Sequence, residues 1–167
     1  MQAQPTSQIR SVLMVCMGNI CRSPTAEAVF RQMAQAHGLS VHIDSAGTIG
    51  HHSGAKPDPR SVKVGQGRGY DFGHICSRKV VPDDFYKFDL ILAMDQANFD
   101  DLIDTCPEKQ LAHKVRLMLE FSSQSEHSEV PDPYYGGARG FDLVLDLIED
   151  ASQGLVTHIT ESYPSQG

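Results

Sequence analysis

The chain has 167 residues, with 14 lysines and arginines against 21 aspartates and glutamates, and its formal net charge is −7. This length suits one domain with a sizeable core. The acidic balance argues against sequence-independent binding to nucleic acid or to an anionic membrane. No apolar run approaches the roughly 20 residues that span a bilayer, and the N-terminus lacks the features of a signal peptide. We therefore expect one cytoplasmic domain over 1–167, with a core at about 10–156 and loose tails at 1–8 and 158–167.

The charges are divided unevenly along the chain. Residues 1–80 contain nine Lys or Arg and four Asp or Glu, whereas residues 81–167 contain five and seventeen. A basic N-terminal half could hold an anion, but a solvated surface with uneven charge explains the same count. The charge distribution alone leaves both interpretations open.

Hydrophobic patterning predicts strands that alternate with helices. In chain order, the predicted elements are a strand at 11–16, a helix at 25–38, a strand at 41–47, a helix at 58–69, a strand at 88–95, a helix at 96–106, a strand at 114–121 and a helix at 141–155. Loops are predicted at 47–59 and throughout 122–140, where turn-forming residues gather. This alternation indicates a doubly wound α/β domain with a parallel sheet.

The first strand and the first helix carry the clearest signals. SVLMVC at 11–16 is an almost unbroken apolar run, typical of a strand buried on both faces of a sheet. Apolar residues then recur at helical spacing, and Gly38 stands where a C-terminal helix cap belongs. In open α/β sheets, ligands bind beyond the carboxyl ends of the strands. We therefore expect functional residues in the segment between these two elements.

That segment has the composition of an anion-binding loop. Cys16 ends the predicted strand, and Arg22 follows six positions later at the start of the helix. Gly18 and Asn19 between them tolerate the positive φ of a tight wrap, which can aim backbone N–H groups inward. Arg22 would clamp two phosphoryl oxygens with its planar fork. This positive environment favours the thiolate form of Cys16, and Ser23 could donate a hydrogen bond to the sulfur.

The other readings of this cysteine are an inert buried thiol and a metal ligand. With no export signal we expect reduced thiols at Cys16, Cys21, Cys76 and Cys106, which favours reactive chemistry over structural disulfides. Zinc binding by Cys16 and Cys21 is disfavoured, because no second Cys or His pair stands at finger spacing. We therefore expect no metal and no cofactor.

VLMVCMGNICRSPTAEAVF closely resembles the signature of the low molecular weight protein tyrosine phosphatases. DSAGT at 44–48, PDPR at 57–60, Met94-Asp95 and DPYYGG at 132–137 follow in the family's order, so the resemblance covers about residues 10–156. The resemblance implies a three-layer domain with a four-stranded parallel sheet and a phosphate-binding loop after the first strand. It also implies hydrolysis of phosphotyrosine through a phosphocysteine, without a metal.

The resemblance assigns roles by position. It makes Cys16 the nucleophile, Arg22 the phosphate and transition-state binder, and Asp132 the general acid that protonates the departing tyrosinate and then activates water. The implied phosphate-binding loop also contains Met17, Gly18, Asn19, Ile20, Cys21 and Ser23. Cys21 matches a second cysteine that can form a reversible disulfide with Cys16.

Further positions match the surroundings of the family's site. Asn19, Ser45, His74 and Asp95 match residues that brace the loop, although by themselves they read as a turn Asn, a loop Ser, a surface His and a helix N-cap. The pocket entrance is expected to include His51, His52, Tyr134 and Tyr135. Bacterial members usually carry an aromatic residue, often Trp, at the position of His51. This departure affects the expected substrate preference and leaves the chemistry unchanged.

Three alternatives accompany this interpretation. Arsenate reductases with the same fold need two further cysteines a few residues apart, whereas Cys76 and Cys106 are thirty positions apart. Protein-arginine phosphatases carry Thr at the position of Ile20, where an aliphatic residue favours phosphotyrosine. A phosphate-binding module without turnover would be expected to lack the cysteine, the arginine or the acid.

The implied partners are phosphotyrosine proteins, such as a bacterial tyrosine autokinase of polysaccharide export or the host targets of a secreted effector. Inorganic phosphate and other oxyanions are expected to compete.

Overall fold

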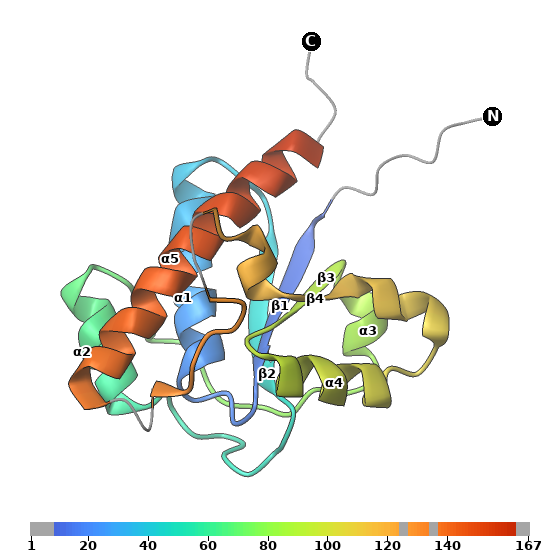
Figure 1. Ribbon diagram of the computed structural model, residues 1–167, viewed down its shortest axis with the longest axis horizontal. Helices are drawn as coiled ribbons and strands as arrows, with labels where there is room; N and C mark the ends of the chain where they lie inside the picture. The colour runs from blue at the N-terminus through green and yellow to red at the C-terminus, as the bar shows by residue number, and fades with distance from the viewer. Residues whose placement is uncertain (1–8, 124–126, 134–136, 163–167) are drawn as a thin grey trace.

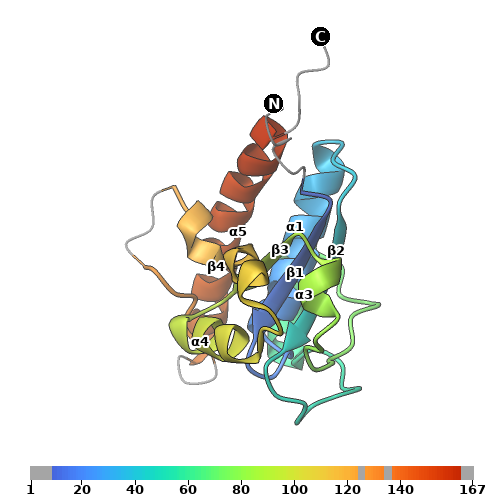
Figure 2. The same ribbon diagram turned by 90° about the vertical axis from the view of Figure 1, so that its right-hand side faces the viewer.

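In the computed structural model, helices cover both faces of a central parallel sheet (Figures 1 and 2). The structure describes residues 9–123, 127–133 and 137–162. In chain order, the elements are β1 (Ser11–Cys16), α1 (Arg22–Ala36), β2 (His42–Gly47), α2 (Pro59–Gly67), α3 (Asp84–Lys87), β3 (Leu90–Ala93), α4 (Gln96–Thr105), the 3₁₀ helix η1 (Lys109–Lys114), β4 (Val115–Leu117), the 3₁₀ helix η2 (Met118–Phe121) and α5 (Gly137–Ser162). The predicted fold class is confirmed.

The strand order places a ligand site beyond the C-terminal ends of β1 and β3. The four strands are parallel in the order β2-β1-β3-β4, so the chain leaves β1 toward one edge and later returns to its other side. Such a reversal of strand order opens a crevice beyond the carboxyl ends of the two central strands. The segments that follow β1 and β3 begin at Met17 and Met94, and both carry predicted site residues.

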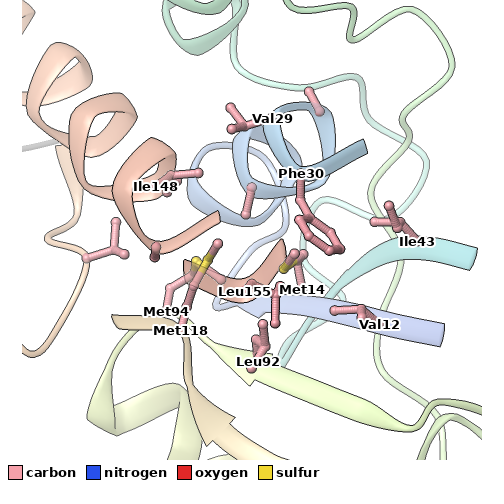
Figure 3. Packing of buried hydrophobic residues seen from close by; sticks show 14 of the residues in the cluster. Val12, Met14, Val29, Phe30, Ile43, Leu92, Met94, Met118, Ile148 and Leu155 are labelled. Carbon is pink, nitrogen blue, oxygen red and sulfur yellow. The ribbon is translucent and has the colours of Figure 1, made fainter. Parts of the chain in front are cut away.

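Alternate side chains of β1 enter two separate cores, as expected for a strand covered on both faces. Val12 and Met14 pack with α1 and α5, where Phe30, Ile148 and Leu155 join them (Figure 3). Leu13 and Val15 face the opposite layer, which includes α3, α4 and η1. The unbroken apolar run of β1 therefore fixes the strand rigidly, with Cys16 at its end.

The prediction was wrong where the chain depends on contacts between distant segments. Only Val115–Leu117 of the predicted strand at 114–121 pairs with β3, and Met118–Phe121 turns into η2, which packs against α5. The closing helix begins at Gly137, inside the predicted loop, and continues to Ser162. Ile159 is fully buried, which explains why the helix extends beyond the tail boundary predicted at 158. Residues 1–8 and 163–167 lie outside the described residues.

The approach of α5 to η2 requires a glycine, which gives a test of this packing. A Cβ on Gly154 would collide with the backbone carbonyl of Phe121. We expect Gly154→Ala to destabilise the fold by about 1–3 kcal/mol, even though alanine is ordinarily the better helix former. Gly67→Ala is the control, because nothing lies within 4 Å of its added Cβ. Urea denaturation should show the loss at Gly154 alone, and equal midpoints for the two variants would contradict the close approach.

Candidate active site

Cys16 lies at the C-terminal end of β1, where the buried sheet meets the turn into α1. The residue is 3% exposed, so its sulfur lies at the floor of the site. The backbone N–H of Asn19 points at Sγ, with 3.3 Å between nitrogen and sulfur. The hydroxyl of Ser23 lies 3.0 Å from the same sulfur. The 16–22 loop therefore wraps around Cys16 and directs polar hydrogens at it.

Asn19 determines how Ser23 can interact with the sulfur. Nδ2 of Asn19 donates to Oγ of Ser23 at 2.7 Å, while Oδ1 accepts the backbone N–H of Arg78 at 3.1 Å. Since Ser23 Oγ accepts from Asn19, its own hydrogen can point at Sγ of Cys16. Asn19 adopts a φ of 58°, the only positive φ at a non-glycine position in the described chain. Asparagine tolerates this left-handed conformation better than most residues.

Arg22 begins α1 and is held from one edge of its guanidinium. Nη1 donates to Oδ2 of Asp95 at 2.6 Å and to the carbonyl of Val130 at 3.1 Å. Burial by itself would lower the pKa of Arg22, but Cys16, Asp95 and Asp132 outweigh burial and raise it above its ordinary value. Within the described residues, the edge made by Nε and Nη2 takes no part in these bonds. That edge can bind two oxygens of an oxyanion.

Two anchors bring Asp132 to the cavity that contains Cys16. Val130 is fully buried, its N–H donates to the carbonyl of Met94 at 2.8 Å, and its carbonyl accepts from Arg22. Asp132 follows two residues later and lines the same cavity as Cys16 and Arg22. The three residues predicted to perform catalysis are therefore brought together from β1, α1 and the segment before α5.

The cavity has a volume of about 340 Å³ and is open to solvent on one side. Its lining consists of Cys16, Met17, Gly18, Ile20, Cys21, Arg22, His51, His52 and Asp132. The His52 ring lies over the loop, since a Cβ on Gly18 would be 3.0 Å from its Cδ2. The His51 ring meets it edge-on, with 4.9 Å between centroids. Both histidines thus lie at the cavity, while Tyr134 and Tyr135 fall outside the described residues.

The cysteines differ in their surroundings. Cys21 lines the cavity with Cys16, and both are free and buried. Burial raises the pKa of the Cys21 thiol to about 12; a hydrogen bond with Ser61 opposes this rise, and weaker interactions with Asp58, Cys16 and Asp132 add to it. Cys76 is exposed, and the Cys106 thiol donates to the carbonyl of Glu108 at 3.1 Å. These two thiols lie outside the cavity.

Two of the predicted bracing residues bond elsewhere. The Ser45 hydroxyl donates to Oε1 of Glu27 at 2.6 Å, and His74 is exposed and lies 2.7 Å from Nη1 of Arg31. Arg31 in turn binds Glu27, so Ser45 and His74 belong to a network along α1. The side-chain bonds of Ser45 and His74 thus go to an acidic and a basic residue of α1, and their support of the loop stays a prediction. Asn19 bonds to Ser23, and Asp95 bonds to Arg22.

Sequence reasoning missed the residues that hold the loop from behind. Ser77 donates its hydroxyl to the carbonyl of Gly18 at 2.9 Å, and the backbone N–H of Arg78 donates to Asn19. Val130 was also missed, although it anchors both Arg22 and the segment of Asp132. The apolar Val130 before Pro131 is the only local signal, and nothing near Ser77 in the sequence points to the loop.

The sequence model described as low molecular weight phosphotyrosine protein phosphatase matches residues 11–165. A low molecular weight protein-tyrosine-phosphatase of Streptomyces coelicolor is 42% identical over 154 residues, covering 90% of this chain and 93% of the relative. The chain belongs to this family. A protein tyrosine phosphatase of Entamoeba histolytica, crystallised with Hepes in its active site, superposes with a TM-score of 0.87 and 47% identity, covering 91% of this chain and 97% of that one. YfkJ of Bacillus subtilis superposes with a TM-score of 0.87 and 36% identity, covering 93% and 98%.

The family consists of hydrolases, so the cavity described above is the candidate active site of a phosphatase. Among residues 9–123, 127–133 and 137–162, no three His, Cys, Asp or Glu side chains are grouped so that they could hold a metal ion. Within the same ranges, every helix is too short or too polar to cross a membrane.

Substitution of Asn19 separates backbone strain from the hydrogen bonds that this residue makes. Asn19→Ala should destabilise the fold by about 1–2 kcal/mol, because a left-handed conformation is costly for alanine. Asn19→Gly relieves that cost but also removes the bonds to Ser23 and Arg78. We therefore expect both variants to lose at least about tenfold in kcat on an aryl phosphate, and the alanine variant to have the lower urea midpoint of the two, since it alone carries the backbone strain as well as the lost bonds. Full activity of Asn19→Gly would show that the side-chain bonds are dispensable.

Proposed function

We propose that this enzyme hydrolyses phosphotyrosine in proteins through a phosphocysteine, with Cys16 as the nucleophile, Arg22 as the phosphate binder and Asp132 as the general acid and base. The observation that carries the proposal is the cavity lined by a buried sulfur that accepts a backbone N–H, by the guanidinium of Arg22 and by the carboxyl group of Asp132. These are the parts that an in-line displacement at phosphorus requires.

In the first step, the Cys16 thiolate attacks the phosphorus of the bound monoester. An S–P bond forms as the P–O bond to the tyrosine ring breaks, and the Asp132 carboxyl gives its proton to the departing oxygen. Tyrosinate is a poor leaving group because free tyrosine ionises near pH 10. A positioned general acid typically contributes about 10²–10⁴-fold in such a step. Backbone N–H groups of the loop and Arg22 bind the equatorial oxygens, where the negative charge is spread.

In the second step, water hydrolyses the phosphocysteine. The Asp132 carboxylate takes a proton from water as its oxygen attacks phosphorus, and the S–P bond breaks. Cys16 leaves as a thiolate, which the Ser23 hydroxyl at 3.0 Å and the Asn19 N–H stabilise. Inorganic phosphate is the product and can compete with the substrate for the same binding site.

The position of the sulfur supports an aryl phosphate as substrate. Since Cys16 is almost completely buried, a phosphoryl group must reach it at the end of a long, narrow side chain. A phenyl ring between the phosphate and the peptide provides that length, and Met17, Ile20 and His52 offer it largely apolar walls. A tyrosine autokinase of polysaccharide export, or host proteins, would meet this requirement through their phosphotyrosines, and the resemblance to bacterial members supports such substrates.

The role of Asp132 can be tested with a series of substituted phenyl phosphates. Asp132→Ala should lower kcat by about 10²–10⁴-fold for leaving groups of high basicity and much less for p-nitrophenol, which departs more easily. Steady-state kinetics across the series would show a steeper dependence on leaving-group basicity in the variant. A uniform loss would mean that Asp132 positions the substrate and donates no proton.

Cys16→Ser serves as the control for this series. It should abolish turnover of every member, because a serine hydroxyl is not ionised at neutral pH. A phosphoenzyme trapped on Cys76 or Cys106 would overturn the assignment of the nucleophile.

We further propose that Cys21 protects Cys16 during oxidation. Peroxide converts the Cys16 thiolate to a sulfenic acid and releases hydroxide. Cys21 loses its proton and attacks that sulfur, so an S–S bond forms as the S–O bond breaks, and the departing hydroxide takes up a proton to become water. The attacking species is the Cys21 thiolate, which is scarce at neutral pH because its pKa is about 12. Below that pKa, its fraction rises tenfold with each pH unit.

Two measurements test this protection. After mild peroxide, dithiothreitol should restore the wild-type enzyme, whereas Cys21→Ser should be oxidised further and remain inactive. Disulfide formation, followed by mass spectrometry after a peroxide pulse, should accelerate by up to about a hundredfold between pH 7 and pH 9. Equal recovery of the two proteins, or a closing rate independent of pH, would exclude Cys21 as the resolving thiol.

A further inference from the structure

Ser77 lies in the segment between α2 and α3, behind the 16–22 loop and outside the catalytic cavity. It is 4% exposed, and its hydroxyl donates to the carbonyl oxygen of Gly18 at 2.9 Å. The next residue, Arg78, donates its backbone N–H to the Asn19 side chain at 3.1 Å. Two consecutive residues thus hold the loop at Gly18 and at Asn19.

The segment that carries Ser77 is itself firmly anchored. The N–H of Ser77 donates to the carbonyl of Ala55, and its carbonyl accepts from Gly54, both at 2.8 Å. The carbonyl of Arg78 accepts the N–H of Gly47 at 2.8 Å, which joins the segment to β2.

The guanidinium of Arg78 adds a second anchor. It binds Asp44 of β2 and Asp84 of α3, with distances of 3.0–3.2 Å. Burial by itself would lower the pKa of Arg78, but Asp84 and Asp44 raise it, so the cation is paired on both sides. Ser77 therefore holds the loop from a fixed support.

The contact with Gly18 determines the direction of a neighbouring N–H group. The carbonyl of Gly18 and the N–H of Asn19 belong to one planar trans peptide, so they point in opposite directions. Ser77 holds the carbonyl away from the cavity, and the N–H consequently points at Sγ of Cys16. Gly18 has no Cβ, so the backbone alone restricts this peptide weakly. If the peptide turned over, a carbonyl oxygen would face the thiolate and the bound anion.

We propose that Ser77 is a positioning residue for oxyanion binding by the 16–22 loop. It keeps the Gly18–Asn19 peptide oriented with its N–H toward Cys16. Ser77 does not touch the substrate, and it acts through the peptide. The inference rests on the proposed function of the 16–22 loop. Under this proposal, Ser77 contributes to oxyanion affinity and to transition-state binding in addition to the catalytic residues.

Alkylation of Cys16 by two reagents tests the proposal. Iodoacetate and iodoacetamide react in the same way, with the thiolate displacing iodide, but only iodoacetate brings a negative charge to the inward N–H groups. We expect Ser77→Ala to lower the ratio of the iodoacetate rate to the iodoacetamide rate about tenfold and to raise the inhibition constant of inorganic phosphate to a similar degree. Mass spectrometry of the Cys16 peptide keeps alkylation of the exposed Cys76 out of the measurement.

Ser152→Ala is the matched control, because Ser152 is fully buried and its hydroxyl has no hydrogen-bond partner in the described structure. Its rate ratio and its kcat should equal those of the wild type. Ser77→Thr and Ser77→Val repeat the comparison at equal side-chain size, so a hydroxyl effect remains measurable if Ser77→Ala folds poorly. The threonine variant should keep a higher rate ratio than the valine variant.

The outcomes separate the two proposals. A wild-type Cys16 that shows no preference for iodoacetate and no protection by phosphate would overturn the proposed function of the loop. A normal wild type combined with an unchanged ratio in Ser77→Ala, or with equal losses toward both reagents, would overturn the positioning role alone.

Discussion

The orientation of the Asn19 N–H toward the sulfur of Cys16 is the constraint on which the rest of the site depends. A buried sulfur that must carry negative charge is costly unless hydrogen-bond donors replace the lost water. The Asn19 N–H and the Ser23 hydroxyl occupy that position here. Asn19 directs its N–H at the sulfur while in a left-handed conformation, with a φ of 58°.

The fold meets that constraint by bringing backbone segments unusually close together. A Cβ on Gly47 would lie 2.6 Å from the carbonyl of Met17 and 3.0 Å from that of Ile49. The absence of a side chain at the end of β2 therefore allows the chain after β2 to run directly beside the loop. The N–H groups of Thr48 and Ile49 donate to the carbonyls of Cys16 and Met17 at 3.0 and 3.1 Å. These bonds turn two loop carbonyls outward, as Ser77 does for a third.

The sequence predicts those parts of the site that depend on residues close together in the chain. The apolar run of β1 locates Cys16, and the Asp95 side chain caps α4 through the Asn98 N–H as its position before a helix indicates. The bonds of Ser45 and His74 could not be predicted from local pattern, because their partners Glu27 and Arg31 are 18 and 43 residues away in the sequence. Ser77 gave no signal, since its partner Gly18 is 59 residues away.

The count of charged residues along the sequence suggests a basic N-terminal half, but the ion pairs of the structure change that interpretation. Arg22 is paired with Asp95, Arg31 with Glu27, and Arg78 with Asp44 and Asp84. Arg68 is also paired with Asp142, Asp146 and Glu149. Carboxylates from the acidic half of the chain, which include Asp84 and Asp95, thus offset much of the basic excess of residues 1–80. Attraction for an oxyanion must then arise from oriented groups over distances of a few ångströms, namely the peptide dipoles of the loop and one edge of Arg22. A peptide dipole attracts an anion only when its N–H points at that anion. The residues that fix the orientation of the loop peptides therefore matter as much to this site as Arg22.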